Sequence, residues 1–175
     1  MDRFLEEAVS KRNRALDEVL YYASLVLMIV TGVLGFLFLQ SVMAAGLGAL
    51  IPAVVMIGIA VYLWFTHDKF RTEYEYTFTN GSLDFAMVFN NKKRKALGSL
   101  NVAKVDAFGK VSSGSFRRHI QGDVKHLRWF LNRDSELYYL AFSKEGKKSV
   151  IVFEPSEELV GYIKHYLPYG AHQEN

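Results

Sequence analysis

Residues 19–66 read VLYYASLVLMIVTGVLGFLFLQSVMAAGLGALIPAVVMIGIAVYLWFT, a run that contains no Asp, Glu, Lys or Arg. Helices exposed to water normally carry a polar face, so a soluble fold does not explain this run. A bilayer core needs about 20 apolar residues per helix, and the run is long enough for two. We predict transmembrane helices over 20–40 and 43–65, with Gln40, Ser41 and Val42 at the reversal. The first is predicted to be a retained anchor, because its apolar stretch exceeds the roughly 7–15 residues of a signal-peptide core.

Basic residues near the ends of the spans predict the orientation. They lie before the first span and after the second, and the connecting turn has none. Because basic flanks stay on the cytoplasmic side, both termini are expected in the cytoplasm and the chain in a multi-pass plasma-membrane location. These flanking residues are Arg3, Lys11, Arg12, Arg14, Lys69 and Arg71.

Residues 1–19 combine apolar and charged side chains at helical spacing, with Phe4, Leu5, Ala8 and Val9 on the apolar side. We predict a cytoplasmic amphipathic helix here. Two arrangements remain open: an extension of the first membrane helix, or a separate helix lying on the lipid headgroups.

Small residues recur every four positions in the second span, at Ala45, Ala49 and Ala53. Thr31 and Gly35 follow the same spacing in the first span. Such residues let helix backbones approach closely, so we expect helix packing within the hairpin, with homo-oligomerisation as the alternative. Neither span contains the ionisable residues that mark ion or proton paths, which argues against a transporter or channel.

The period changes after the second span. Alternating apolar residues predict strands at 74–78 and 83–89, joined by the hairpin signal Asn80-Gly81. Further strands are expected around 94–98, 102–111, 125–131, 136–143 and 149–153. Ser156 with Glu157 and Glu158 predicts the start of a helix over 156–167, which Pro168 ends. Residues 70–170 are therefore predicted to form a small, mainly antiparallel β barrel or sandwich closed by a C-terminal helix.

This order resembles the bacterial pleckstrin-homology-like (PH-like) domains that follow paired membrane helices. The resemblance rests on the segments 74–81 and 100–105, on a basic hairpin, and on the helix that begins at Ser156. More narrowly, the whole chain resembles an uncharacterised family of bacterial two-span membrane proteins, a domain of unknown function. The resemblance implies a fold and a location, and it carries no catalytic motif.

No arrangement of residues in the sequence indicates catalysis, a metal or a cofactor. The five histidines lack zinc-site spacing, there is no cysteine, and the glycines form no phosphate loop. We therefore expect a chain that is not an enzyme and holds no cofactor or metal. Nucleic acid is not an expected partner either, because most aromatic residues fall on the core-facing register of the strands.

Basic residues concentrate in one region, 92–133, which carries eleven basic and two acidic residues for a net charge of +9. Lys92, Lys93, Arg94 and Lys95 are expected at or beside a hairpin tip. A basic cluster on a membrane-tethered domain favours contact with anionic lipid. We interpret the chain as a membrane-anchored module that binds a lipid headgroup, a peptide or a protein partner. The alternative is an accessory subunit of a larger membrane assembly that docks through the helical hairpin.

Overall fold

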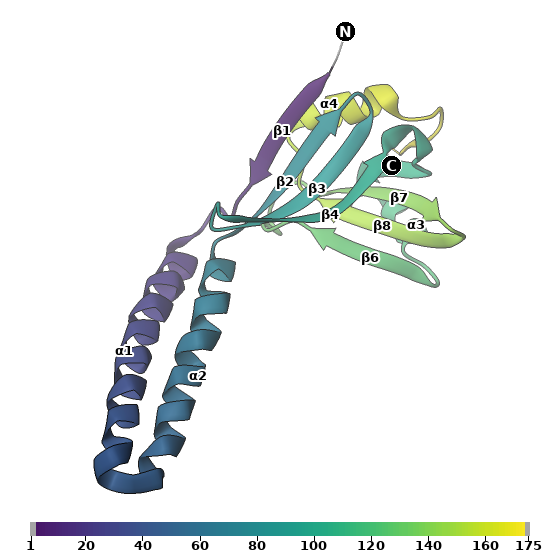
Figure 1. The fold of residues 1–175 in the computed structure, drawn as a ribbon. Helices are drawn as coiled ribbons and strands as arrows, with labels where there is room; N and C mark the ends of the chain where they lie inside the picture. Colours follow the sequence, from purple (N-terminus) through teal and green to yellow (C-terminus); the bar gives the residue numbers. More distant parts are fainter. Residues whose placement is uncertain (1–2, 174–175) are drawn as a thin grey trace. The chain divides into compact units, whose positions relative to one another are not determined.

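A computed structural model of the chain describes residues 3–173 and divides into two compact units. One unit, residues 13–72, is a helical hairpin. The other joins residues 1–12 to residues 73–175 and is a β domain. The chain therefore leaves the β domain after its first strand, builds the hairpin and returns to the same domain (Figure 1).

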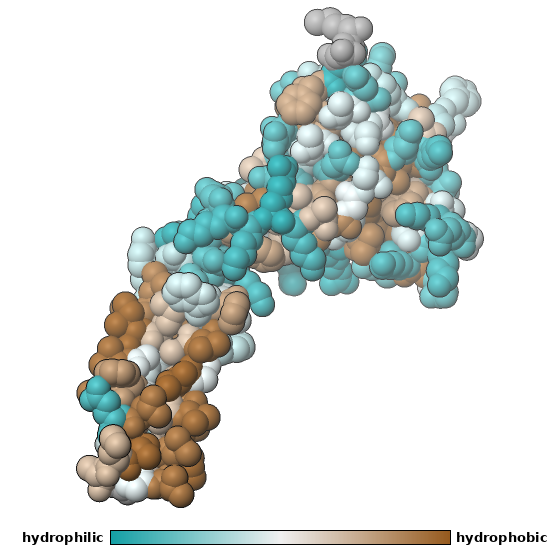
Figure 2. Space-filling model, in the orientation of Figure 1, coloured by the Kyte–Doolittle hydropathy of each residue, from teal (hydrophilic) through white to brown (hydrophobic). Residues whose placement is uncertain are grey.

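The hairpin consists of α1 (Ala15–Ala45), the 3-10 turn η1 (Gly46–Ala49), α2 (Leu50–Thr66) and the 3-10 turn η2 (His67–Phe70). Two segments are long and apolar enough to span a membrane, Ala15–Ala44 and Gly46–Phe70. The face of the hairpin seen in Figure 2 is mainly hydrophobic. The reversal predicted at 40–42 is wrong: the chain turns at η1, where Gly46 adopts a φ of 73° that favours glycine.

Two sheets make up the β domain. The first has the order β1-β2-β3-β4 and the second the order β6-β8-β7-β5-β9. The strands are β1 (Phe4–Val9), β2 (Thr72–Thr79), β3 (Ser82–Phe89), β4 (Lys93–Asn101), β5 (Ala107–Lys110), β6 (Val124–Trp129), β7 (Tyr138–Lys144), β8 (Lys147–Phe153) and β9 (His172–Gln173). The remaining elements are η3 (Val102–Lys104), α3 (Gly114–His119) and α4 (Glu157–Tyr166). The expected PH-like combination of mainly antiparallel strands is present, but the sheets do not close into a barrel.

Tight turns set the register of three strand pairs. Asn80 and Gly81, Asn90 and Asn91, and Glu145 and Gly146 all have positive φ. Two consecutive positive-φ residues form the type I′ turn, whose twist matches that of paired antiparallel strands. The hairpin predicted from Asn80-Gly81 is therefore confirmed.

The helix predicted over residues 1–19 is wrong in its first half, because residues 4–9 form β1. This strand pairs antiparallel with β2 from Phe4↔Thr79 to Val9↔Tyr74. Leu5 and Val9 pack against the core, and the Glu7 carboxylate accepts a hydrogen bond from the backbone N–H of Ser156 at 3.1 Å. Six residues are too few to distinguish the periodicity of a helix from that of a strand. Residues 4–9 form a strand because they can pair with the edge of β2.

The main core lies between the facing sides of the two sheets and is rich in aromatic rings. Tyr76, Phe85 and Phe153 are buried together with ring centroids 5.5 Å apart in pairs. The Tyr76 hydroxyl donates to the Trp129 carbonyl and accepts from the backbone N–H of Glu154 at 3.3 Å. Burial in this apolar setting strongly raises the pKa of Tyr76, so it stays a neutral donor.

The C-terminal helix begins as the sequence predicts. The Ser156 side chain accepts from the backbone N–H of Leu159 at 3.2 Å, which satisfies a donor of the first turn. Leu159, Val160 and Ile163 are buried in the main core. A second, smaller core lies on the outer face of the second sheet, where Phe116 of α3 packs near Tyr139. α3 is a single short helix in a segment for which the sequence predicted no element.

This topology predicts that the β domain folds without the hairpin. Joining Val9 to Tyr74 through Asn-Gly replaces the helices by a two-residue turn between residues that already pair. We expect residues 3–9, Asn-Gly and 74–173 to unfold cooperatively on heating, followed by circular dichroism. Residues 74–173 alone should melt at a lower temperature, because they lack β1. Equal melting temperatures would contradict an integral role of β1.

The buried face of α4 makes a second prediction in the same shortened chain. Ile163→Ala should lower the free energy of unfolding by about 2–5 kcal/mol, because it leaves a cavity in the main core. The neighbouring exposed change Lys164→Ala is the control and should stay within about 0.5 kcal/mol. Chemical denaturation measures both. Equal effects would show that α4 does not anchor the core.

Candidate functional site

The two helices of the hairpin pack along a narrow seam. On α1 the buried positions are Tyr21, Ser24, Thr31 and Gly35, which are separated by steps of about three, four or seven residues as in a coiled-coil stripe. Thr31 adds no unsatisfied group, because its hydroxyl donates to the Leu27 carbonyl at 2.8 Å. At the end where the hairpin joins the β domain, Arg71 pairs with Glu18 and lies 3.8 Å from the Tyr21 ring centroid.

The three alanines predicted to pack in the hairpin do not share one environment. Ala53 is fully buried, Ala49 lies half-buried in the turn η1, and the side chain of Ala45 lies outside the described set. The closest approach involves Gly35 instead. A Cβ on Gly35 would lie 2.7 Å from Cγ1 and 3.0 Å from the backbone N of Ile57. Gly35, identified in the sequence for its spacing, is therefore the glycine of α1 that lies closest to the opposite helix.

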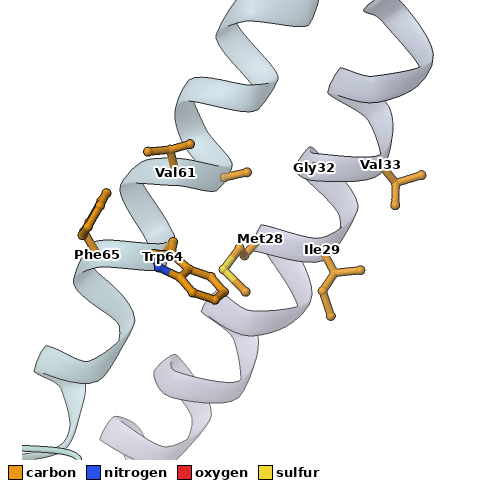
Figure 3. A pocket seen from close by; sticks show the side chains of 8 residues that line it. Met28, Ile29, Gly32, Val33, Val61, Trp64 and Phe65 are labelled. Atoms are coloured by element: carbon orange, nitrogen blue, oxygen red, sulfur yellow. The ribbon is translucent and has the colours of Figure 1, made fainter. Parts of the chain in front are cut away.

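A shallow groove of about 580 Å³ runs along one side of this hairpin (Figure 3). Residues of both helices line it, and Trp64 of α2 points toward Met28 of α1 (Figure 3). All of its lining residues are apolar or glycine. The full lining is Met28, Ile29, Gly32, Val33, Ala60, Val61, Trp64 and Phe65. In a bilayer such a groove could accommodate lipid chains, but its apolar lining is not suited to bind a polar group.

The basic block Lys92, Lys93, Arg94 and Lys95 lies at the turn after β3 and at the start of β4, and all four residues are exposed. Arg94 pairs with Glu75 of β2 and, at 3.3 Å, with Glu6 of β1. Side chains alternate along a strand, so Lys93 and Lys95 project to the other face of the sheet. The block is thus divided between two faces of the sheet, and Arg94 pairs with acidic residues of the same domain.

A groove of about 210 Å³ opens between β4 and β6. Each of these strands is the last in its sheet, so two free strand edges flank the groove. The groove is lined by Phe85, Leu97, Gly98, Ser99, Leu100, Lys125, Leu127, Trp129, Phe142, Lys144, Ser149 and Ile151.

A bulge in β4 shapes this groove. Phe85 pairs with Gly98 and the next residue, Ala86, pairs with Ala96, so Leu97 is the extra residue. The bulge brings both Leu97 and Gly98 to the inner face. Because Gly98 has no side chain, the Trp129 ring fits against it: a Cβ there would lie 3.4 Å from Cη2 of Trp129. Trp129 in turn packs on Phe85 with ring centroids 4.7 Å apart.

The chemistry of the groove is that of a binding surface. Its floor is apolar, and its only charged lining residues among those described are Lys125 and Lys144. Free strand edges offer backbone donors and acceptors to an added strand. Elsewhere, the residues that the structure describes contain no group of three or more His, Asp or Glu arranged to hold a metal ion. The sequence analysis did not find the groove, since it depends on which strands end each sheet.

The fold and the groove define a protein with two candidate membrane-spanning helices and a β domain of the PH-like class. The family model described as "Bacterial PH-like domain (DUF6106)" matches residues 1–172, so the chain belongs to this family. The match includes the hairpin as well as the β domain and confirms the resemblance seen in the sequence. No curated protein and no solved structure was found to match the chain.

A disulfide across the seam can report whether the two helices pack as described. A Cβ on Gly32 would lie 3.9 Å from that of Ala60, within the range of a disulfide. The chain has no cysteine of its own, so Gly32→Cys with Ala60→Cys should form one disulfide on mild oxidation in membranes.

Adding Gly35→Leu should slow this crosslinking strongly, because the new side chain would collide with the backbone of Ile57. Adding Gly58→Leu, at a position with open space around it, is the matched control and should leave the rate unchanged. Non-reducing electrophoresis after timed oxidation measures the rates. A slower rate with Gly58→Leu alone would contradict the seam described here.

Proposed function

We propose that this chain is a non-enzymatic binding module anchored in the plasma membrane, with both termini and the β domain on the cytoplasmic face. Its β domain would bind an extended, acidic segment of a protein partner in the groove between β4 and β6. The observation that carries this proposal is the pair of free strand edges that flank an apolar groove with two lysines at its rim.

The topology of the chain supports the orientation. β1 precedes α1, β2 follows α2, and these two strands pair with each other in one sheet. This pairing supports a hairpin whose two ends lie on the same side of the membrane. The basic residues beside these ends favour the cytoplasmic side.

The geometry of the groove supports an extended peptide as the ligand. A strand that pairs with β4 or β6 gains main-chain hydrogen bonds, and its alternate side chains can enter the apolar floor. The rim lysines Lys125 and Lys144 meet no acidic lining residue, so acidic side chains in the ligand would complement them. A lipid contact through the basic block of Lys92, Lys93, Arg94 and Lys95 stays a prediction, in which Arg94 also pairs with Glu75.

The orientation predicts the accessibility of single cysteines. Leu47→Cys lies in the turn of the hairpin, where Leu47 is 77 % exposed, and Tyr169→Cys lies on the surface of the β domain. An impermeant maleimide added to intact cells should label the first variant and leave the second unlabelled until the membrane is opened. The reverse pattern would contradict a cytoplasmic β domain.

The groove predicts a preference for acidic extended peptides. The probe is a fluorescent ten-residue peptide of alternating valine and aspartate, and its counterpart carries lysine in place of aspartate. The full chain in uncharged detergent should bind the acidic peptide about tenfold more tightly, measured by fluorescence anisotropy. Equal affinity for the two peptides would contradict the assigned ligand.

Matched variants locate the binding. Lys125→Gln with Lys144→Gln should weaken binding of the acidic peptide roughly tenfold, because two favourable charges are lost. Lys104→Gln with Lys164→Gln removes the same charge at exposed positions outside the groove lining and should have little effect. Equal losses would indicate general electrostatic attraction. If neither peptide binds, the alternative of an accessory subunit that docks through the hairpin gains support.

A further inference from the structure

A second concave site lies on the other side of the second sheet from the groove. It is a pocket of about 340 Å³ between the end of α3 and strands β7 and β8. Its polar lining residues include Asp106, Arg118, His119, Gln121, Ser143 and Lys148. Lys148 and Val150 of β8 line this pocket and alternate with Ile151, which lines the groove, so these side chains lie on opposite faces of the sheet, while Phe142 and Ser149 line both sites.

Two cations come together in this pocket from different elements. Arg118 lies in the last turn of α3, and Lys148 lies on β8. One guanidinium nitrogen of Arg118 donates to the Gln173 side chain at 3.3 Å, which orients the arginine and leaves other donors of its fork available. The pocket thus presents the oriented guanidinium of Arg118 and the ammonium group of Lys148. Together these two cations suit a tetrahedral oxyanion.

The acidic residue of the pocket does not cancel these charges. The Asp106 carboxylate accepts a hydrogen bond from the Ser143 hydroxyl at 2.9 Å, so one of its oxygens is already satisfied. With Arg118 and Lys148 charged and His119 neutral, these four side chains carry one net positive charge. Gln121 and Ser143 add groups that can hydrogen-bond to hydroxyls of a ligand.

His119 reports on the charge inside the pocket. It is half-buried, with its ring centroid 5.6 Å from that of Tyr139. Burial lowers the pKa of His119, Arg118 and Lys148 lower it further, and Asp106 acts in the opposite direction. An anion placed among these groups would stabilise the imidazolium and raise the pKa of His119.

We propose that this pocket is a binding site for a phosphomonoester group, held by Arg118 and Lys148. The pocket is larger than a lone phosphate needs, so the ligand would carry a small polar body within reach of Gln121. A soluble phosphorylated metabolite and a lipid with a terminal phosphate share this chemistry. The proposal does not depend on the peptide groove, because the two sites use different charged side chains.

The first test uses the full chain in uncharged detergent micelles and inorganic phosphate as the probe. Histidine resonances followed by NMR should show the pKa of His119 rising when phosphate replaces chloride at equal ionic strength. The exposed His165 of α4, remote from the pocket lining, should not respond and serves as the internal control. If both histidines respond alike, or if neither does, the proposal is overturned.

Neighbouring residues offer matched variants for the same test. Arg118→Gln and Lys148→Gln should each weaken phosphate binding about tenfold, because each removes a charged hydrogen-bond donor. Arg117→Gln and Lys147→Gln remove equal charge at adjacent positions outside the lining and should bind as the unaltered chain does. Asp106→Asn should strengthen binding. Equal weakening by the outer pair would reduce the site to general surface charge and refute it.

A further arm separates the two sources of phosphate. The full chain is reconstituted into neutral vesicles, and either glycerol 3-phosphate is added or phosphatidic acid is included in the bilayer. A response of His119 to glycerol 3-phosphate alone assigns a soluble ligand, and a response to phosphatidic acid alone assigns a lipid. Both responses would support the pocket. The absence of both would overturn it, even if inorganic phosphate binds.

Discussion

The pairing of β1 with β2 is the constraint on which the rest of this structure depends. Val9 and Tyr74 are direct partners although the whole hairpin lies between them in the sequence. The entropy of closing a long loop rises only slowly with its length, by about 0.6 kcal/mol per doubling. Two antiparallel helices reduce that cost further, because they return the chain to its starting side. A membrane hairpin is therefore accommodated as an insertion within one turn of a soluble sheet.

A buried polar network extends this constraint beyond the strands. Asn132 accepts from the backbone N–H of Arg12 at 2.9 Å and donates to the Ser10 carbonyl at 3.0 Å. Its amide also donates to the Glu154 carboxylate, which accepts from the Ser135 hydroxyl as well. Since a buried amide left unpaired costs about 1–3 kcal/mol, these partners hold the chain after β1 in one conformation. The segment is thus fixed to the β domain up to Arg12.

The sequence predicted the features that are set by neighbouring residues and missed those that depend on contacts between distant segments. The charge-free run is a continuous stretch of sequence, the turn at Asn80-Gly81 and the cap at Ser156 involve only a few residues, and all three features are found. The conformation of residues 4–9 depends on the distant edge of β2, so the sequence analysis assigned a helix there. The turn of the hairpin was misplaced because the polar residues Gln40 and Ser41 lie near the middle of the run, whereas the chain turns at Gly46–Ala49. The pocket at Arg118 and Lys148 joins two distant elements and had no local signal.

The open edge of β4 suggests a second explanation for the basic block. A free strand edge invites unwanted pairing with other chains, and charged residues on the edge oppose it. Lys93, Arg94 and Lys95 protect the first half of β4 in this way, whereas residues 96–101 carry no charge. The uncharged half is also the half that lines the groove. Along β4, charged protection against pairing is therefore absent in the half that lines the groove, as the proposed binding of an extended segment requires.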